Sequence, residues 1–287
     1  MKILLTGCSG QVGHELERSL QSIGQVVAVD RATMDLSNLD RVRAVIREVR
    51  PQLIVNPAAY TAVDKAESEP DLAFRINAEA PGVMADEAKR LGATLVHYST
   101  DYVFSGDEPG ARSETDATGP VNVYGASKLA GEEAVAASGA AHLILRTSWV
   151  YGLRGRNFLL TMLRLAKERD ELRVVADQHG APTWSRTVAD TTAAILAQAR
   201  AHGFAPAWWQ EHGGIYHLSS QGQTTWCGFT EAIVAQAGID CRVVPITSAE
   251  YPTPARRPRH SVLSSQRLLE RFCHVPTWRD ALRLCMQ

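Results

Sequence analysis

The chain has 287 residues, of which 45% are hydrophobic, and 30 Lys and Arg residues nearly balance 31 Asp and Glu residues. That length predicts one large core or two unequal lobes, and a formal net charge of -1 provides no global field that would attract nucleic acid or an anionic membrane. The 5 cysteines are scattered without a Cys-x-x-Cys pair and no apolar run approaches the roughly 20 residues of a membrane helix, so we expect a cytoplasmic protein without disulfides.

Short apolar runs alternate with longer amphipathic segments over residues 1–150. The apolar periodicity predicts strands at 3–5, 26–29, 53–56, 94–99 and 143–146, with helices at 11–21, 39–49, 71–90 and 124–137. This alternation is typical of βαβ units with helices on both faces of a parallel sheet. We therefore predict an α/β fold, with a Rossmann-like doubly wound sheet as a dinucleotide-binding domain over 1–150.

The regular alternation weakens after residue 150, where turn-rich stretches separate shorter elements. Residues 151–287 are predicted to form mainly a smaller, substrate-binding lobe. Segments 157–167 and 187–199 still have the periodicity of full-length amphipathic helices, so this lobe is expected to be partly interleaved with the first domain.

A glycine-rich turn follows the first predicted strand and precedes the first predicted helix. Gly7, Gly10 and Gly13 are spaced three apart there, with Gln11 and Val12 between them. Glycine permits both the tight turn and the close approach of backbone N–H groups to a pyrophosphate at the positive end of a helix. Glycines also mark ordinary turns, but the strand-turn-helix context favours a dinucleotide site.

The end of the second predicted strand carries two residues that point to different cofactors. Asp30 stands at about the separation expected for a carboxylate that binds the adenosine ribose hydroxyls. The neighbouring Arg31 suits a 2′-phosphate instead. We expect binding of both NADPH and NADH, with NADPH slightly favoured.

A tyrosine and a lysine spaced four residues apart open the helix predicted at 124–137. Tyr124 and Lys128 therefore share one helical face. A neighbouring ammonium is expected to lower the pKa of a tyrosine and make it a better acid near neutrality. Taken alone, such a pair is more often a surface pair, but the fourth strand ends at the same edge, where Thr100 or Ser99 offers a hydroxyl to a substrate carbonyl. Glu132, one turn further, is expected to face solvent.

The chain resembles the extended short-chain dehydrogenases/reductases, in the branch that reduces dTDP-linked keto sugars. The resemblance is carried by the loop from Gly7 to Gly13 and by runs along the whole chain, namely VNPAAYTAVDKAE at 55–67, YSTDYVF at 98–104, NVYG at 122–125, RTSWVY at 146–151, DQHGAPT at 177–183 and YPTPARRP at 251–258. It implies reduction of the 4-keto group of dTDP-4-dehydro-L-rhamnose to dTDP-L-rhamnose, for cell-surface polysaccharide synthesis.

The resemblance also implies residue roles. Tyr124 is the expected proton donor, Lys128 its cationic partner and Thr100 the hydroxyl that binds the carbonyl. The expected substrate contacts are Thr100, Asp101 and Trp149. Residues expected to line the dinucleotide site, besides Tyr124 and Lys128, are Gly10, Gln11, Val12, Asp30, Asp35, Leu36, Ala59, Tyr60 and Thr61.

Two departures bear on alternative functions. Related sugar-nucleotide 4,6-dehydratases carry Asp-Glu after the strand-end threonine, whereas Tyr102 follows Asp101 here, which disfavours a dehydratase or epimerase. A non-catalytic, dinucleotide-binding regulatory subunit is a further alternative, disfavoured because the three catalytic residues are present. In some relatives carboxylates hold a metal between subunits, and one of these positions is Arg186 here, although Glu15 remains. The sequence therefore leaves Mg2+ possible without supporting it, no metal ligand is assigned, and the protein is expected to be a monomer or weak homodimer.

The segment 251–260 holds Arg256, Arg257 and Arg259 between prolines. Guanidinium groups bind phosphate oxygens through paired hydrogen bonds. These arginines are candidates for a clamp on the substrate pyrophosphate, with a solvated loop as an equal alternative.

Overall fold

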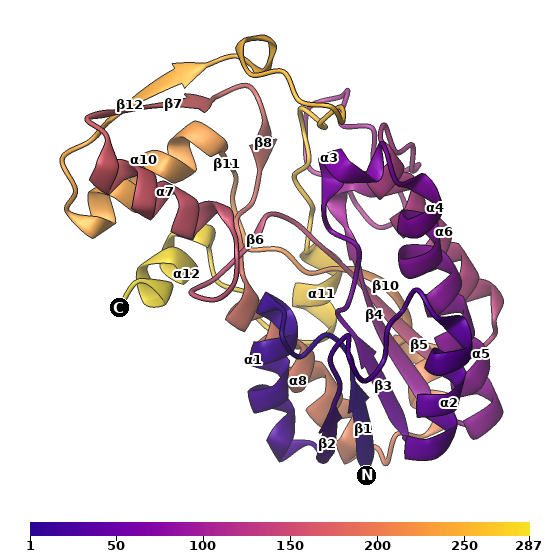
Figure 1. Ribbon diagram of the computed structural model, residues 1–287. Helices are drawn as coiled ribbons and strands as arrows, with labels where there is room; N and C mark the ends of the chain where they lie inside the picture. Colours follow the sequence, from indigo (N-terminus) through magenta and orange to yellow (C-terminus); the bar gives the residue numbers. More distant parts are fainter.

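The central feature of the computed structural model, which describes all residues 1–287, is a sheet of six parallel strands (Figure 1). The strand order is β10-β5-β4-β3-β1-β2, and every neighbouring pair is parallel. This arrangement confirms the predicted Rossmann-like doubly wound sheet. The strands are β1 (Lys2–Leu5), β2 (Gln25–Ala28), β3 (Leu53–Asn56), β4 (Thr94–Thr100), β5 (His142–Thr147) and β10 (Gly214–His217).

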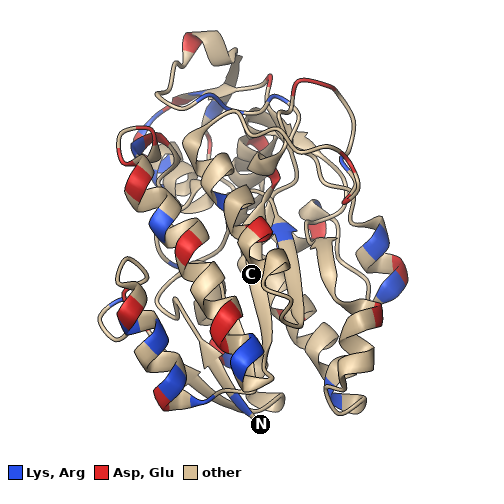
Figure 2. Cartoon of the chain, turned by 90° about the vertical axis from the view of Figure 1, so that its right-hand side faces the viewer, with Lys and Arg blue, Asp and Glu red and all other residues tan.

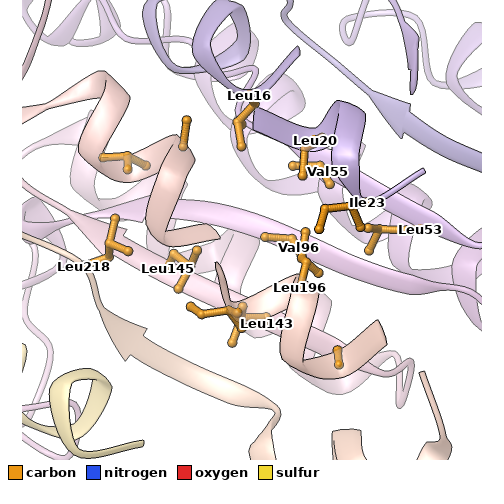
Figure 3. Close-up of a cluster of buried hydrophobic side chains, with 14 of the residues drawn as sticks. Leu16, Leu20, Ile23, Leu53, Val55, Val96, Leu143, Leu145, Leu196 and Leu218 are labelled. Atoms are coloured by element: carbon orange, nitrogen blue, oxygen red, sulfur yellow. The ribbon is translucent and has the colours of Figure 1, made fainter. Parts of the chain in front are cut away.

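Helices cover both faces of this sheet, which is why every residue of its central strands β3 and β4 is buried. One face packs against α1 (Gln11–Ser19), α8 (Ser185–Ala201), α9 (Pro206–His212) and α11 (Gln266–Arg271). Figure 3 shows Leu16 and Leu196 from two of these helices meeting Val55, Val96 and Leu145 of the sheet. The other face packs against α2 (Leu39–Val49), α5 (Ala80–Leu91) and α6 (Val123–Ala137).

The helix predicted at 71–90 is interrupted by one π-helical segment. It consists of α4 (Pro70–Phe74), the π segment η2 (Arg75–Glu79) and α5. Pro81 has no N–H to donate to the carbonyl of Asn77 four residues earlier, so the regular α-helical hydrogen bond is missing at this point. The π segment buries Asn77, and Gly131 of α6 approaches so closely that a Cβ there would lie 2.1 Å from the Asn77 oxygen.

A second lobe lies beyond the carboxyl ends of the central strands (Figure 1). Its core packs α7 (Phe158–Glu168), α10 (Trp226–Ala237) and α12 (Trp278–Cys285) with β7 (Glu171–Val175) and β12 (Arg242–Ile246), which pair in parallel. Two further pairs are β6 (Val150–Tyr151) with β9 (Thr183–Trp184), and β8 (His179–Gly180) with β11 (Thr224–Thr225). The chain after residue 150 also supplies α8, α9, β10 and α11 to the sheet lobe.

Acidic and basic residues are interspersed along the helices and loops of the cartoon in Figure 2, in keeping with the net charge of -1. None of the helices combines the length and the hydrophobicity that crossing a lipid bilayer requires.

Candidate functional site

The glycine loop between β1 and α1 has the geometry of a backbone cradle. Gly7 has a positive φ of 57°, which favours glycine, and the N–H of Gly10 donates to the Gly7 oxygen at 2.9 Å. A Cβ on Gly13 would lie only 2.1 Å from that same oxygen. The first turn of α1 contains no acidic residue, so its positive end is available to an anion.

A cavity of about 550 Å³ opens between this loop and the carboxyl ends of β3, β4 and β5. It brings together residues that the sequence predicted separately, from the glycine loop, from strand β4 and from helix α6. The predicted site residues on its wall are Gly7, Gly10, Gln11, Val12, Gly13, Ala59, Thr61, Thr100, Asp101, Tyr124, Lys128 and Trp149.

Four predicted cofactor residues lie outside this wall, beyond the end of β2. Asp30 accepts hydrogen bonds from the backbone and hydroxyl of Thr33, both at 3.0 Å, and these bonds lower its pKa. Arg31 forms an exposed ion pair with Asp35 at 3.4 Å. Leu36 is only 7% exposed and packs in the core, and its role at the dinucleotide site stays a prediction.

Tyr60 also lies outside the cavity wall, and its hydrogen bonds stabilise the loop after β3. Its hydroxyl donates to Glu69 at 2.7 Å. Burial, and to a smaller extent the Glu69 carboxylate, raises the pKa of Tyr60 to about 12. Asn77 from the π segment accepts from the Tyr60 N–H at 2.8 Å and donates to the Tyr60 oxygen at 3.0 Å. The neighbouring wall residues Ala59 and Thr61 are thereby held in place.

Thr100 and Asp101 form a buried polar pair at the end of β4. The Thr100 hydroxyl donates to Asp101 Oδ1 at 2.9 Å and accepts from the Tyr102 N–H at 3.2 Å. Ser148 donates to the other carboxylate oxygen at 3.1 Å. Asp101 is 2% exposed, and burial raises its pKa to about 6 although these hydroxyls stabilise the anion.

The first turn of α6 is held against this pair. Asn122 caps the helix by accepting from the Gly125 N–H at 2.8 Å. A Cβ on Gly125 would lie 2.2 Å from the Tyr102 oxygen, so only glycine allows the helix to come this close. The rings of Tyr102 and Tyr124 meet edge to face with centroids 5.8 Å apart.

The expected effect of Lys128 on Tyr124 is wrong for the free protein. Burial raises the pKa of Tyr124 to about 12, and the Asp101 charge adds to this rise. Lys128 does not offset it because its own pKa is lower, so the lysine is already neutral at the pH where the phenol ionises. Its side-chain nitrogen lies 2.6 Å from the backbone carbonyl oxygen of Tyr98 and 3.2 Å from His97 Nε2. Burial in turn lowers the pKa of Lys128 to about 8.

The expectation that Glu132 faces solvent is also wrong. Glu132 is 3% exposed and forms a bidentate pair with Arg146, with distances of 2.6 and 2.9 Å. The pairing residue lies 14 positions away on β5, so helical periodicity gave no signal of it.

Trp149 follows β5 and forms part of the cavity wall with a strained backbone. Its φ is 47°, a conformation that costs a residue other than glycine about 1–3 kcal/mol. The indole stacks on Trp226 with centroids 3.6 Å apart and an interplanar angle of 5°. A Cβ on Gly180 would lie 2.3 Å from the Trp149 ring, so the indole is held between that glycine and Trp226.

A second cavity of about 570 Å³ lies beside the arginine-rich segment. Arg256, Arg257 and Arg259 all line it. Arg257 donates to Asp64 at 2.9 Å, and the Ala255 N–H donates to the same carboxylate at 3.2 Å. Asp64, which sequence reasoning did not single out, therefore fastens this segment to the sheet lobe.

A second set of cations was missed by the sequence reasoning and lies next to the glycine loop. The Arg154 guanidinium lies 3.4 Å from the Ser9 oxygen, and Asn157 donates to Gln11 at 2.8 Å. Arg156 is exposed and lines the first cavity. The only signal in the sequence was a turn containing two arginines.

The comparisons with known proteins cover the full length of the chain. The family model described as RmlD substrate binding domain matches residues 1–287. The chain is 52% identical to the dTDP-4-dehydrorhamnose reductase of Burkholderia thailandensis over 296 residues, with 100% of this chain and 98% of the relative covered. It is 46% identical to the enzyme of that name from Escherichia coli K12, with 99% and 96% covered.

Solved structures extend this likeness to three dimensions. The dTDP-4-dehydrorhamnose reductase of Bacillus anthracis, solved in complex with NADP, superposes with a TM-score of 0.90 at 37% identity, covering 99% of this chain and 98% of that one. A Thermus thermophilus UDP-glucose 4-epimerase in complex with NAD gives a TM-score of 0.83 at 22% identity, over 100% and 98% of the two chains, and shows the fold alone. The full-length matches show that the chain belongs to the dTDP-4-dehydrorhamnose reductase family.

Proposed function

We propose that this enzyme reduces the 4-keto group of dTDP-4-dehydro-L-rhamnose with NADPH or NADH and releases dTDP-L-rhamnose. The observation that carries the proposal is the cavity that joins the glycine loop to Thr100, Tyr124 and Lys128. Family membership narrows the substrate to the one named for the relatives.

The glycine loop and its surroundings suit the cofactor. When bound, the reduced nicotinamide supplies the hydride, and the chain has to hold its pyrophosphate. Backbone N–H groups at the start of α1 and the exposed Arg154 and Arg156 provide positive charge on two sides of that position. Asp30 is proposed to bind the adenosine ribose and Arg31 a 2′-phosphate. The remaining predicted wall residues, Gln11, Val12, Ala59 and Thr61, are proposed to enclose the dinucleotide.

Tyr124 is proposed to donate the proton to the carbonyl oxygen. A phenol whose pKa is about 12 is a weak acid in the free protein, but the substrate oxygen becomes a strong base as hydride arrives and negative charge develops on it, and this drives transfer of the proton from the phenol. Lys128 supplies the positive charge that stabilises the resulting phenolate. Thr100 has to turn its hydroxyl from Asp101 to the substrate oxygen, since that hydrogen is already donated in the free protein.

The second lobe is proposed to bind the nucleotide part of the substrate. Arg259 lines the second cavity without a carboxylate partner, whereas Arg256 and Arg257 pair with Asp107 and Asp64. The negatively charged pyrophosphate of the substrate would be attracted to these three arginines. Trp149, at the boundary between the lobes, is proposed to contact the sugar.

The division into a dinucleotide-binding part, residues 1–150, and a mainly substrate-binding part, 151–287, remains our proposal for the domains. The protein is further proposed to act as a monomer or weak homodimer. The 5 free cysteines support a reducing, cytoplasmic location.

The decisive assay supplies dTDP-4-dehydro-L-rhamnose with NADPH or NADH and measures both loss of the reduced cofactor and formation of dTDP-L-rhamnose. Stoichiometric conversion supports the proposal. Cofactor binding without consumption would favour a non-catalytic subunit, and conversion of a nucleotide sugar without net oxidation of the cofactor would favour an epimerase or dehydratase.

A further inference from the structure

A chain of buried hydrogen bonds connects the glycine loop to Lys128 through the interior of the sheet. Thr6 donates to Asn56 Oδ1 at 2.6 Å, Asn56 Nδ2 lies 3.1 Å from His97 Nδ1, and His97 Nε2 lies 3.2 Å from Lys128 Nζ. All four side chains are at most 2% exposed. The chain crosses neighbouring strands β1, β3 and β4 and ends at the proposed catalytic lysine, yet the reaction as described uses neither Asn56 nor His97.

The hydrogens of Lys128 are accounted for by this geometry. An ammonium group has three N–H donors. The backbone carbonyl oxygen of Tyr98 accepts one of them at 2.6 Å, and a second points at His97 Nε2. The third is left for the cavity that Lys128 lines together with Tyr124. His97 therefore helps to fix the direction in which the lysine faces the reacting groups.

The charge of Lys128 and the tautomer of His97 are linked by the donor and acceptor rules. A neutral imidazole has one N–H and one acceptor nitrogen. With the Asn56 amide nitrogen facing Nδ1, the imidazole proton lies on Nε2, and Lys128 can accept it only as a neutral amine. With the amide turned over, Nδ1–H donates to the Asn56 oxygen, Nε2 accepts from the ammonium, and the amide nitrogen donates to Thr6. Lys128, His97 and Asn56 keep their partners in both arrangements, whereas the Thr6 hydroxyl donates to Asn56 in the first and accepts from it in the second.

The electrostatics keep the imidazole neutral while the lysine titrates. Burial, followed by the charge of Lys128, holds the pKa of His97 well below its usual value. Burial lowers the pKa of Lys128 to about 8, opposed by the Glu132 carboxylate one turn along α6. The other titratable and charged groups around this cluster are Tyr98 on β4, Tyr124 on α6, Asp101 after β4, and Arg146 on β5, which pairs with Glu132.

We propose that His97 is a positioning residue for the reaction, and that its imidazole changes tautomer together with the Asn56 amide whenever Lys128 gains or loses a proton. The lysine then keeps two partners in either charge state and stays in place beside Tyr124. The kinetic consequence rests on the proposed reductase function, whereas the tautomer change does not.

The direct test is nitrogen NMR of the full-length protein labelled at its histidines, with the lysine side chains observed in parallel. His97, assigned from the signal lost in His97→Gln, is expected to remain neutral at every pH. Its two ring nitrogens are expected to exchange donor and acceptor character at the pH where Lys128 titrates. One unchanged tautomer through the Lys128 titration, or a protonated His97, would overturn the proposal whether or not the protein is a reductase.

The kinetic test compares His97→Leu with His97→Gln. Leucine removes the acceptor, so we expect kcat to fall about 100-fold with little change in KM, and the alkaline loss of activity to move to lower pH. Glutamine offers an amide oxygen to Lys128, and we expect it to restore most of kcat and the original pH profile. Equal losses in both variants with an unchanged profile would indicate packing alone.

A buried hydroxyl elsewhere provides the control for a lost hydrogen bond. Thr192 is fully buried on α8 and bonds the Tyr98 hydroxyl at 2.8 Å. Thr192→Val is expected to lower the urea concentration at which the protein unfolds without moving the pH profile. A profile that moved as far in this variant as in His97→Leu would contradict a specific role for His97.

Discussion

Asp101 is a buried carboxyl whose ionisation should lower the stability of the enzyme, and Asp101→Asn tests this cost. The replacement keeps the shape of the side chain and removes its charge. The oxygen of the new amide can still accept from Thr100, and the Ser148 hydroxyl can turn to accept from the amide nitrogen.

The magnitude follows from the raised pKa. Burial raises the pKa of Asp101 from 3.8 to about 6 in the folded protein. The unfolded carboxyl ionises as pH rises above about 4, while the folded one keeps its proton until about pH 6. The protonated carboxyl contributes its full stability below the unfolded-state pKa of about 4. This contribution is lost as the pH rises through the folded-state pKa of about 6. A shift of about 2 units corresponds to about 3 kcal/mol.

The assay is urea unfolding of both proteins across the pH range from about 4 to 8. The stability of Asp101→Asn relative to the parent is expected to rise by about 3 kcal/mol over this range, mostly between about pH 4 and 6. The control is Asp40→Asn, because the side chain of Asp40 is 95% exposed and a change below about 0.5 kcal/mol is expected. A difference that does not vary with pH for Asp101→Asn would refute the reasoning.

Three further substitutions test other parts of the account. Gly13→Ala places a Cβ 2.1 Å from the Gly7 oxygen, so we expect NADPH binding, measured by fluorescence titration, to weaken at least about 100-fold. Glu132→Gln leaves the Arg146 charge buried without its counter-ion and should lower the free energy of unfolding in urea by about 3–5 kcal/mol. Arg31→Ala should weaken NADPH binding about 10-fold and leave NADH binding nearly unchanged, because only NADPH carries the 2′-phosphate.

Matched variants exclude general effects for these predictions. Gly82→Ala on α5 brings a methyl only to 3.3 Å from the Ala134 Cβ and should leave NADPH binding intact. Arg43→Ala removes another surface arginine paired with an aspartate and should not discriminate between the cofactors. Tight NADPH binding by Gly13→Ala, an unchanged stability in Glu132→Gln, or equal losses of both cofactors in Arg31→Ala would contradict the respective prediction.

The sheet and the glycine loop could be predicted because their signals are local. Apolar runs and helical periodicity place five of the six strands to within a residue or two, whereas β10 was not predicted, and the spacing of Gly7, Gly10 and Gly13 depends on one turn. The π segment had a local cause in Pro81, but its consequence, the burial of Asn77 against α6, depends on a distant helix.

Residues that act through distant partners could not be predicted in the same way. Arg257 meets Asp64 across 193 positions, and no periodicity links them. His97 occupies a position in β4 that is buried like its apolar neighbours, so its polarity was a signal, but its partners come from two other elements. The pKa of Tyr124 was predicted in the wrong direction because burial of the phenol raises it, and a four-residue spacing gives a shared helical face but not the burial of that face.

The most direct test of the central claim is the hydride-transfer rate in a single turnover of Tyr124→Phe, measured with NADPH and dTDP-4-dehydro-L-rhamnose alongside NADPH affinity. We predict a rate at least about 100-fold below that of the parent enzyme, with NADPH affinity within about threefold. A Phe variant that transfers hydride at the parent rate would show that another group donates the proton and would contradict the account.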